Sequence, residues 1–193
     1  GAVGVPATHL LTEKDVLYRV DAARIQMMVI SHKDEGVLRS AEVAMQKCES
    51  LKHVMILRGQ REGFHSYEKE MPLQSPVWDK PTGDAYPHNH DLLLLYFTSG
   101  TTGMPKMAAH SWTYPIAQTV TAYYWHNVGD DSIHMAVADT GWAKAGWGKL
   151  YGQWICGATL FVYDFDRFIA ADLLKMLEKH RVTSFCAPPT VYR

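Results

Sequence analysis

A single loop carries most of the side chains that could do chemistry. Tyr96–Lys106 reads YFTSGTTGMPK, in which hydroxyl residues alternate with glycines and a lysine ends the run. Glycine permits a positive φ and lets backbone amides approach an anion, while hydroxyls and an ammonium donate further hydrogen bonds. These residue types in this order predict a polyphosphate site. The residues assigned to it are Thr98, Ser99, Gly100, Thr101, Thr102, Gly103, Met104, Pro105 and Lys106.

Two other interpretations apply to this loop. A cluster of Ser, Thr and Gly is often a plain turn between two strands. A Walker A loop would place its lysine directly after a glycine and before Ser or Thr, whereas Lys106 lies three residues beyond Gly103. The Walker A interpretation is therefore excluded, and the plain turn stays as the simpler alternative.

The order TSGTTGMPK resembles the phosphate-binding signature of the adenylate-forming superfamily. That superfamily includes acyl-CoA synthetases, aryl-CoA ligases, firefly luciferase and peptide-synthetase adenylation domains. Further segments resemble its medium-chain acyl-CoA synthetase branch and are distributed over nearly the whole chain. They are GAVGVPAT at Gly1–Thr8, ADTGWAKAGWGKLYGQW at Ala138–Trp154, GATLFVYD at Gly157–Asp164 and FCAPPTVYR at Phe185–Arg193.

The resemblance implies an enzyme that activates a carboxylic acid with ATP. The acid would become acyl-AMP and then pass to coenzyme A, with release of AMP and pyrophosphate; a medium-chain fatty, branched or aryl acid is expected. The alternatives are an acetyl-CoA or benzoate-CoA type of ligase or, for the isolated chain, a catalytically inactive nucleotide-binding module. Mg²⁺ is expected beside ATP because two phosphates carry more charge than Lys106 neutralises.

The same resemblance implies that the chain corresponds to an internal piece of a larger N-terminal domain. In members of the family, the adenine and ribose contacts and a metal-binding glutamate lie beyond the position of Arg193. A catalytic lysine comes from a small, mobile C-terminal domain. No catalytic residue and no metal ligand is therefore assigned on this chain, which by itself is expected to be nearly inactive.

An acyl-substrate pocket is also implied by the resemblance, with Trp142, Lys144, Trp147 and Cys186 assigned to it. Aromatic walls suit an aliphatic or aryl acid because they remove a large apolar area from water. Both tryptophans could instead be ordinary core, and a lysine on a helix surface is usually solvated. Cys186 is assigned to the pocket wall because it ends a predicted strand and has no adjacent base for nucleophilic catalysis.

Three more residues are interpreted individually. His9 follows VPAT, where members of the family have a residue near the coenzyme A nucleotide, so it is assigned to coenzyme A binding by analogy alone. His110 is interpreted as a hydrogen-bonded structural residue, and Trp154 as part of the core.

The composition indicates an ordinary globular protein. The chain has 193 residues, a net charge of −1 and 47% apolar residues, enough for one or two cores. No basic run suggests nucleic acid, and no apolar stretch approaches the ~18–20 residues of a membrane span. The three widely separated cysteines favour a reducing, cytoplasmic compartment, with the mitochondrial matrix as the alternative. The cysteines and histidines show neither Cys-x-x-Cys nor His-x-x-x-His spacing, so no zinc site is predicted.

Apolar periodicity predicts an α/β fold with layered, mostly parallel sheets and flanking helices. The resemblance implies that this fold corresponds to part of the N-terminal domain of an adenylate-forming enzyme. A capping box at Thr12-Glu13-Lys14-Asp15 is expected to start the first helix. Residues 1–74 are expected to form a first α/β subdomain, and residues 75–90 a proline-containing connector. Residues 91–193 are expected to form a second subdomain that holds the phosphate loop. The C-terminal catalytic domain of the family is expected to be absent from this chain.

The periodicity also predicts individual elements of this fold. Helical spacing covers 37–48 and 169–177, and two further helices are expected at 111–125, capped by Ser111, and at 143–156. The predicted strands cover 26–30, 53–57, 91–97, 106–110, 133–137, 159–163 and 182–186.

Overall fold

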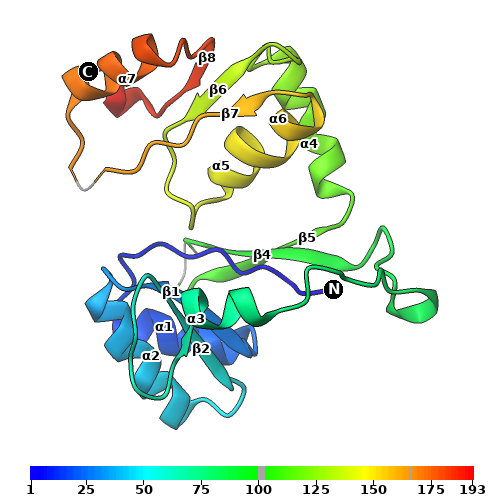
Figure 1. Ribbon diagram of the computed structural model, residues 1–193, viewed down its shortest axis with the longest axis vertical. Helices are drawn as coiled ribbons and strands as arrows, with labels where there is room; N and C mark the ends of the chain where they lie inside the picture. Colours follow the sequence, from blue (N-terminus) through cyan, green and yellow to red (C-terminus); the bar gives the residue numbers. More distant parts are fainter. Residues whose placement is uncertain (100–102, 166) are drawn as a thin grey trace. The chain divides into compact units, whose positions relative to one another are not determined.

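The chain forms two compact units, each built from segments that lie far apart in the sequence (Figure 1). The structure, a computed structural model, describes residues 1–99, 103–165 and 167–193. One unit, called the aromatic unit here, contains residues 1–7, 87–96 and 108–193; the other, called the sheet unit, contains residues 8–86 and 97–107.

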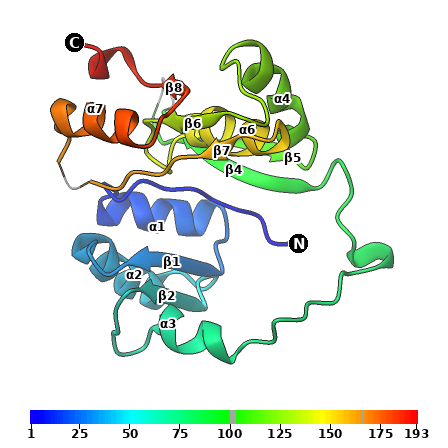
Figure 2. The same ribbon diagram turned by 45° about the horizontal axis from the view of Figure 1, so that its top comes forward.

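The sheet unit holds a three-stranded parallel sheet in the order β1-β2-β3. Figure 2 shows helices α1 and α2 beside the strands β1 and β2. The predicted capping box is confirmed, because the Thr12 hydroxyl accepts from the Asp15 amide and the Asp15 carboxylate accepts from the Thr12 amide. The elements are α1 (Glu13–Ala22), β1 (Met27–Ser31), α2 (Glu35–Lys47), β2 (His53–Leu57), β3 (His65–Ser66) and α3 (Tyr67–Glu70).

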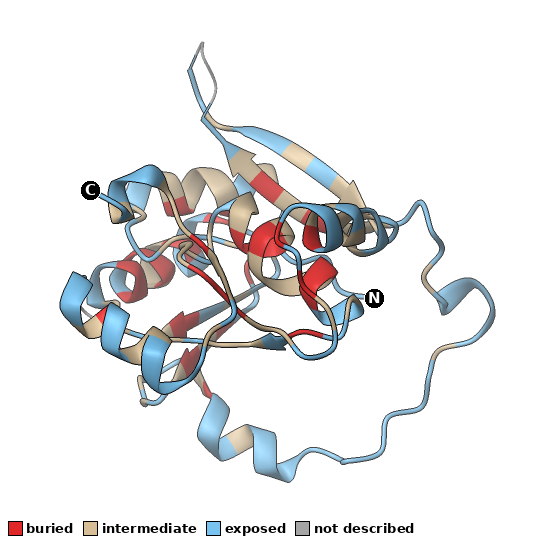
Figure 3. Ribbon diagram, turned by 90° about the horizontal axis from the view of Figure 1, so that it is seen from above, coloured by how far each residue is buried: buried red, intermediate tan, exposed pale blue. Residues whose placement is uncertain are grey.

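Only one face of this sheet is covered by the two helices. Val54 and Ile56 of β2 are buried in one core cluster with Val16 of α1 and Ala41 of α2. Figure 3 colours the buried positions of the chain red. Side chains alternate along a strand, so the residues between them point to the opposite face. On that face Val29 is 57% exposed, which leaves the second side of the sheet open.

Strands β4 (Leu92–Thr98) and β5 (Lys106–Ser111) pair with each other on either side of the predicted phosphate loop. Leu94 and Tyr96 are buried at alternate positions of β4, as the apolar run predicts. Gly4 adds a parallel bridge beside Leu94, and a Cβ at Gly4 would lie 3.0 Å from the Leu94 Cδ2 atom. The predicted strand and its partner are confirmed.

A second parallel sheet, in the order β7-β6-β8, lies in the aromatic unit. Helices α4 and α6 pack closely because Gly152 has no side chain; a Cβ there would collide with the backbone carbonyl of Gln118. The elements are α4 (Tyr114–Tyr124), β6 (Ile133–Ala136), α5 (Ala143–Ala145), a π-helix (Gly146–Leu150), α6 (Tyr151–Ile155), β7 (Thr159–Leu160), α7 (Ala170–Lys179) and β8 (Ser184–Cys186).

Two predicted helices differ from the structure. Ser111 belongs to β5 and does not cap a helix: its hydroxyl lies 2.8 Å from that of Thr113, and α4 starts at Tyr114, where Pro115 fits the first turn. The predicted helix 143–156 is interrupted by the π-helix, whose wider turn changes the side-chain spacing. Short 3₁₀ turns cover Met71–Leu73, Gly83–Ala85 and Pro189–Val191.

Strands β7 and β8 are shorter than predicted, although their positions are right. β7 ends at Leu160 as a regular strand, and one more backbone bond follows, from the Phe161 amide to the His134 carbonyl at 2.8 Å. Within the described residues, none of the helices combines the length and apolar character needed to cross a bilayer.

Candidate active site

The two ends of the phosphate loop meet because β4 and β5 are paired. Thr98 ends β4 and Lys106 begins β5, and the Thr98 hydroxyl lies 3.4 Å from the Lys106 carbonyl oxygen, to which it donates. Both residues are exposed, and among the described residues Lys106 forms no ion pair with an acidic side chain. The backbone of Lys106 is therefore held beside Thr98 at the base of the loop. Of the other predicted members, Gly100, Thr101 and Thr102 lie outside the described residues.

Gly103 has a backbone conformation that favours glycine. Its φ of +139° is rarely adopted by residues with a side chain, and no atom of the described residues lies within 4 Å of a Cβ built there. The requirement for glycine at this position is therefore conformational rather than spatial. The residue type alone was enough to predict that the backbone could adopt a positive φ at this position.

Helix α1 anchors the loop from within the same unit. The Tyr18 hydroxyl donates to the Pro105 carbonyl at 2.8 Å, and the Tyr18 ring meets that of Phe97 edge-on, with centroids 6.0 Å apart. The Arg19 guanidinium lies 5.1 Å from the centre of the Phe97 ring. Sequence reasoning missed Tyr18 and Arg19, because no local pattern joins α1 to a loop almost ninety residues later.

The assigned acyl-pocket residues lie in the aromatic unit. Trp142 directly precedes α5 and is 67% exposed, Lys144 is half-buried on α5, and Trp147 is half-buried on the π-helix. Trp147 stacks on Trp125, with ring centroids 5.6 Å apart and planes at 20°. The α-helical spacing expected to put these side chains on one side does not apply across the π-helix.

Cys186 is the buried last residue of β8 and pairs with Ala136 at the end of β6. Its carbonyl accepts from the Val137 amide at 2.8 Å, at the point where the chain leaves the sheet toward Trp142. The predicted position of Cys186, at the carboxyl end of a strand, is confirmed. Its role in a pocket wall stays a prediction.

A buried polar network lies behind Trp147. His134 is fully buried; its Nε2 donates to the Gly148 carbonyl at 2.8 Å, and its Nδ1 lies 2.9 Å from the Ser184 hydroxyl. Gln153, also fully buried, donates to His126 Nδ1 at 2.9 Å and to the Trp147 carbonyl at 3.3 Å. The side chains of His134 from β6 and Gln153 from α6 thus bond to the backbone of the π-helix that carries Trp147.

Both histidines of this network are held neutral. Burial lowers the pKa of His126 to about 4, with the proximity of His134 and Lys144 acting in the same direction. Burial also lowers the pKa of His134, although its bond to the Gly148 carbonyl opposes the shift. His126 Nε2 and Gln153 Oε1 have no hydrogen-bond partner among the described residues. Neutral imidazoles suit a site packed between indole rings.

Comparison with known proteins identifies the family. The profile described as AMP-binding enzyme matches residues 1–193, the whole chain. The chain belongs to the AMP-binding enzyme family. The family predicted from the sequence is therefore confirmed.

Relatives of this AMP-binding chain are named acyl-CoA synthetases. It is 32% identical over 195 residues to mitochondrial acyl-coenzyme A synthetase ACSM3 of Homo sapiens, a match that covers 100% of this chain and 32% of the relative. Mitochondrial acyl-coenzyme A synthetase ACSM4 of Homo sapiens is 35% identical over 196 residues, with the same coverage. The chain thus spans about a third of the length of the curated relatives that it matches.

Solved structures confirm the predicted α/β fold. The anthranilate CoA ligase AuaEII in complex with anthranoyl-AMP superposes with a TM-score of 0.81 at 22% identity, covering 95% of this chain and 34% of the ligase. A Brucella canis acyl-CoA synthetase gives a TM-score of 0.82 at 20% identity, covering 100% of this chain and 34% of that protein.

The three residues interpreted individually have different surroundings in the AMP-binding chain. His9 is exposed in the turn before α1. His110 lies between Tyr96 and Tyr114, with ring centroids 5.6 and 4.4 Å away, so ring packing surrounds it. The interpretation of Trp154 as core is wrong: it is 59% exposed, because the adjacent Gln153 takes the buried side of α6.

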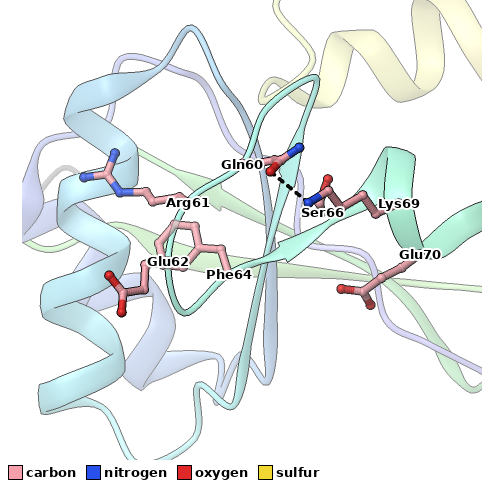
Figure 4. A pocket seen from close by; sticks show the side chains of 7 residues that line it. All are labelled: Gln60, Arg61, Glu62, Phe64, Ser66, Lys69 and Glu70. Carbon is pink, nitrogen blue, oxygen red and sulfur yellow. Dashed lines mark hydrogen bonds between the residues drawn. The ribbon is translucent and has the colours of Figure 1, made fainter.

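The sheet unit of the AMP-binding chain also has a cavity of about 430 Å³, formed by the loop after β2 and by α3 (Figure 4). Lys69 donates to Gln60 across it at 2.8 Å, and the Arg61 guanidinium bonds to Glu42 at 2.6 Å and Glu35 at 2.9 Å. The charged side chains that line the cavity are of both signs and largely paired, so the cavity indicates no ligand class. Its lining consists of Gln60, Arg61, Glu62, Phe64, Ser66, Lys69 and Glu70.

Proposed function

We propose that the protein carrying this chain activates a carboxylic acid with ATP to acyl-AMP and transfers the acyl group to coenzyme A, releasing AMP and pyrophosphate. The observation that carries the proposal is the Thr98–Lys106 loop, set between two paired strands in a chain that matches the AMP-binding family from end to end. The names of the relatives support the same reaction.

The loop suits the first half of that reaction. A carboxylate resists attack by a thiol because an oxide-like group would have to leave, and adenylation replaces this group with AMP. A loop that grips the β- and γ-phosphates holds pyrophosphate in line and offsets the charge that develops on it. Lys106 supplies the positive charge, Thr98 and Ser99 supply hydroxyls, and Gly103 supplies the tight backbone.

Mg²⁺ would be held chiefly by the phosphates of ATP. This ion usually keeps several waters and takes one or two carboxylates from the protein. No group of three or more His, Cys, Asp or Glu side chains able to hold a metal is found in the part of the chain that the structure describes. Bound to the phosphates of ATP, Mg²⁺ would supply electrostatic stabilisation of the leaving pyrophosphate.

The acid itself would be a medium-chain fatty, branched or aryl acid bound beside Trp142, Lys144, Trp147 and Cys186. The stacked indole of Trp147 and the exposed indole of Trp142 offer the apolar area that such acids require. The aryl adenylate held by the anthranilate CoA ligase is in keeping with this substrate class. His9 would contact coenzyme A, and the relatives' names favour a mitochondrial compartment over the cytoplasm.

Acid-dependent ATP–pyrophosphate exchange tests the proposal. The full-length protein should exchange labelled pyrophosphate into ATP only when an acid is present, and an acid series should rank medium-chain and aryl acids against acetate. Exchange that does not depend on an acid, or its absence with every acid, would contradict the function.

The isolated 193-residue chain provides the second arm of this experiment. Because the chain spans about a third of its relatives, we expect it to bind nucleotide weakly and to form acyl-CoA more than tenfold more slowly than the full-length protein. If the full-length protein also binds nucleotide without catalysing exchange, a passive nucleotide-binding module would be favoured.

A further inference from the structure

We propose that His53 and His65 form a binding site for an exchangeable divalent transition metal, Zn²⁺, Ni²⁺ or Cu²⁺, on the open face of the β1-β2-β3 sheet. The strand register brings the two histidines together. Met55 of β2 pairs with His65 of β3, and His53 lies two residues before Met55. Residues two apart on a strand share a face, so both imidazoles stand on the side opposite Val54.

The distance between the imidazoles matches a shared metal. His53 Nδ1 lies 3.1 Å from His65 Nε2, and the rings are tilted at 51° rather than stacked. Two nitrogens at about 2.0–2.1 Å from one ion are separated by roughly 2.9–3.4 Å for angles between octahedral and tetrahedral. The two nitrogens therefore need little movement to bind one ion.

Glu70 prepares His65 as a ligand. His65 Nδ1 lies 2.9 and 3.0 Å from the two carboxylate oxygens of Glu70, which accept only, so Nδ1 carries the proton. The lone pair of the neutral ring is then on Nε2, which faces His53. A carboxylate behind a histidine in this way orients the ring and raises its basicity toward a metal.

Without a metal, the same atoms form a hydrogen-bonded chain. Nδ1–H of His53 donates to Nε2 of His65, whose own Nδ1–H donates to Glu70. An arriving ion takes the place of the central proton, which moves through solvent to Nε2 of His53. Both imidazoles stay neutral, so binding releases no net proton at a pH where both were neutral.

The surroundings leave coordination positions open. His53 is exposed, and the side chains of His65 and Glu70 are each 40% exposed, so water can complete the shell. Because no set of three protein ligands occurs among the described residues, the site has two protein donors and exchanges its metal readily. Imidazole nitrogen suits Zn²⁺, Ni²⁺ and Cu²⁺, and Cu²⁺ should bind more tightly than either of the others.

Calorimetric titration of the full-length protein with ZnCl₂ and with NiCl₂, without nucleotide, tests the proposal. His53→Ala and His65→Ala should each abolish one binding event. Glu70→Gln should weaken that event by about 10- to 100-fold, the usual loss when a carboxylate behind a metal-bound histidine is removed. Glu68→Gln is the matched control: this neighbouring carboxylate of α3 accepts from the Arg58 amide at 2.8 Å, and its replacement should change nothing.

Circular dichroism and thermal unfolding in EDTA establish that each variant is folded. If the His65→Ala variant does not fold, the titrations of His53→Ala and Glu70→Gln test the metal site. Binding that is unchanged in His53→Ala, an equal effect of Glu70→Gln and Glu68→Gln, or no saturable binding by the parent protein would overturn the metal site. None of these outcomes depends on the adenylation reaction, so a failure of the metal site would not contradict the proposed function.

Discussion

The phosphate loop, Thr98–Lys106, and the Trp147 segment, Ala143–Ile155, are held in place by different interactions. Backbone pairing of two neighbouring strands closes the loop, and one tyrosine hydroxyl anchors it at Pro105. The Trp147 segment is instead fixed by buried side chains: His134 of β6 donates to the Gly148 carbonyl, and Gln153 of the segment itself donates to His126. Changes at Thr98 and Lys106, which are exposed, should therefore alter chemistry while the protein stays folded, whereas changes around the segment should alter stability as well.

The largest expected effect is on the loop. Lys106→Ala in the full-length protein should slow adenylation by about thirty- to a thousandfold, since losing charge-assisted bonds to pyrophosphate costs roughly 2–4 kcal/mol. Thioester formation from supplied acyl-AMP should be nearly unchanged, because pyrophosphate has already left. Rates of the two half-reactions measure this, with Lys52→Ala as the control, since Lys52 is an exposed lysine directly before β2. Equal losses in both half-reactions would remove the loop from its proposed role.

Acid should weaken the Trp147 segment through His126, which accepts a hydrogen bond from Gln153. The pKa of His126 is about 4 in the folded state, against an ordinary value of 6.5. Between these values the unfolded chain binds a proton that the folded chain does not, so stability falls as the pH drops from about 6.5 to about 4. The loss should be on the order of 2–3 kcal/mol. Urea unfolding at pH 7 and pH 5 should show a smaller difference for His126→Asn than for the parent; equal differences would contradict the assignment.

Packing between α4 and α6 should tolerate no added methyl group. Gly152→Ala places a Cβ against the Gln118 carbonyl and should cost about 1–3 kcal/mol, or roughly 2–12 °C in Tm. Gly36→Ala is the matched control, because a Cβ in this helix of the sheet unit meets no atom within 4 Å and alanine favours helix. Thermal unfolding should show a loss for the first variant and no loss for the second. A similar Tm for both would mean that the close approach at Gly152 is unimportant.

The smallest expected effect concerns substrate choice. Trp147→Ala should raise kcat/KM for bulky acids relative to short ones by about tenfold, since removing an indole opens volume worth about 1–3 kcal/mol of discrimination. Trp154→Ala removes an exposed indole from the same segment and should leave the ratio unchanged. Kinetics over an acid series, with the KM for ATP as reference, provide the measurement. An unchanged ratio in a folded Trp147 variant would assign this residue to the core.

Local patterns were enough to predict much of the fold. Residues 53–57 form the predicted strand with the predicted bounds, and the Thr12 capping box starts α1 as expected. In both cases the determining interactions lie within a few residues. The cap of α4 and the continuous helix after Ala143 were predicted wrongly, because they depend on the pairing of β5 with β4 and on the bond from His134 of β6 to the π-helix, which lie outside the local helical pattern.

The sequence by itself determined the family, and it was enough to predict a phosphate-binding loop, since an anion site made of glycines, hydroxyls and a lysine needs only a short stretch of backbone and its own side chains. Only the tertiary structure decided the contact of Tyr18 with Pro105, the burial of His134 and the meeting of His53 with His65. Each of these depends on strand register or helix packing between separate segments. Such long-range contacts depend on how the cores pack, and the local spacing of residues does not predict that packing.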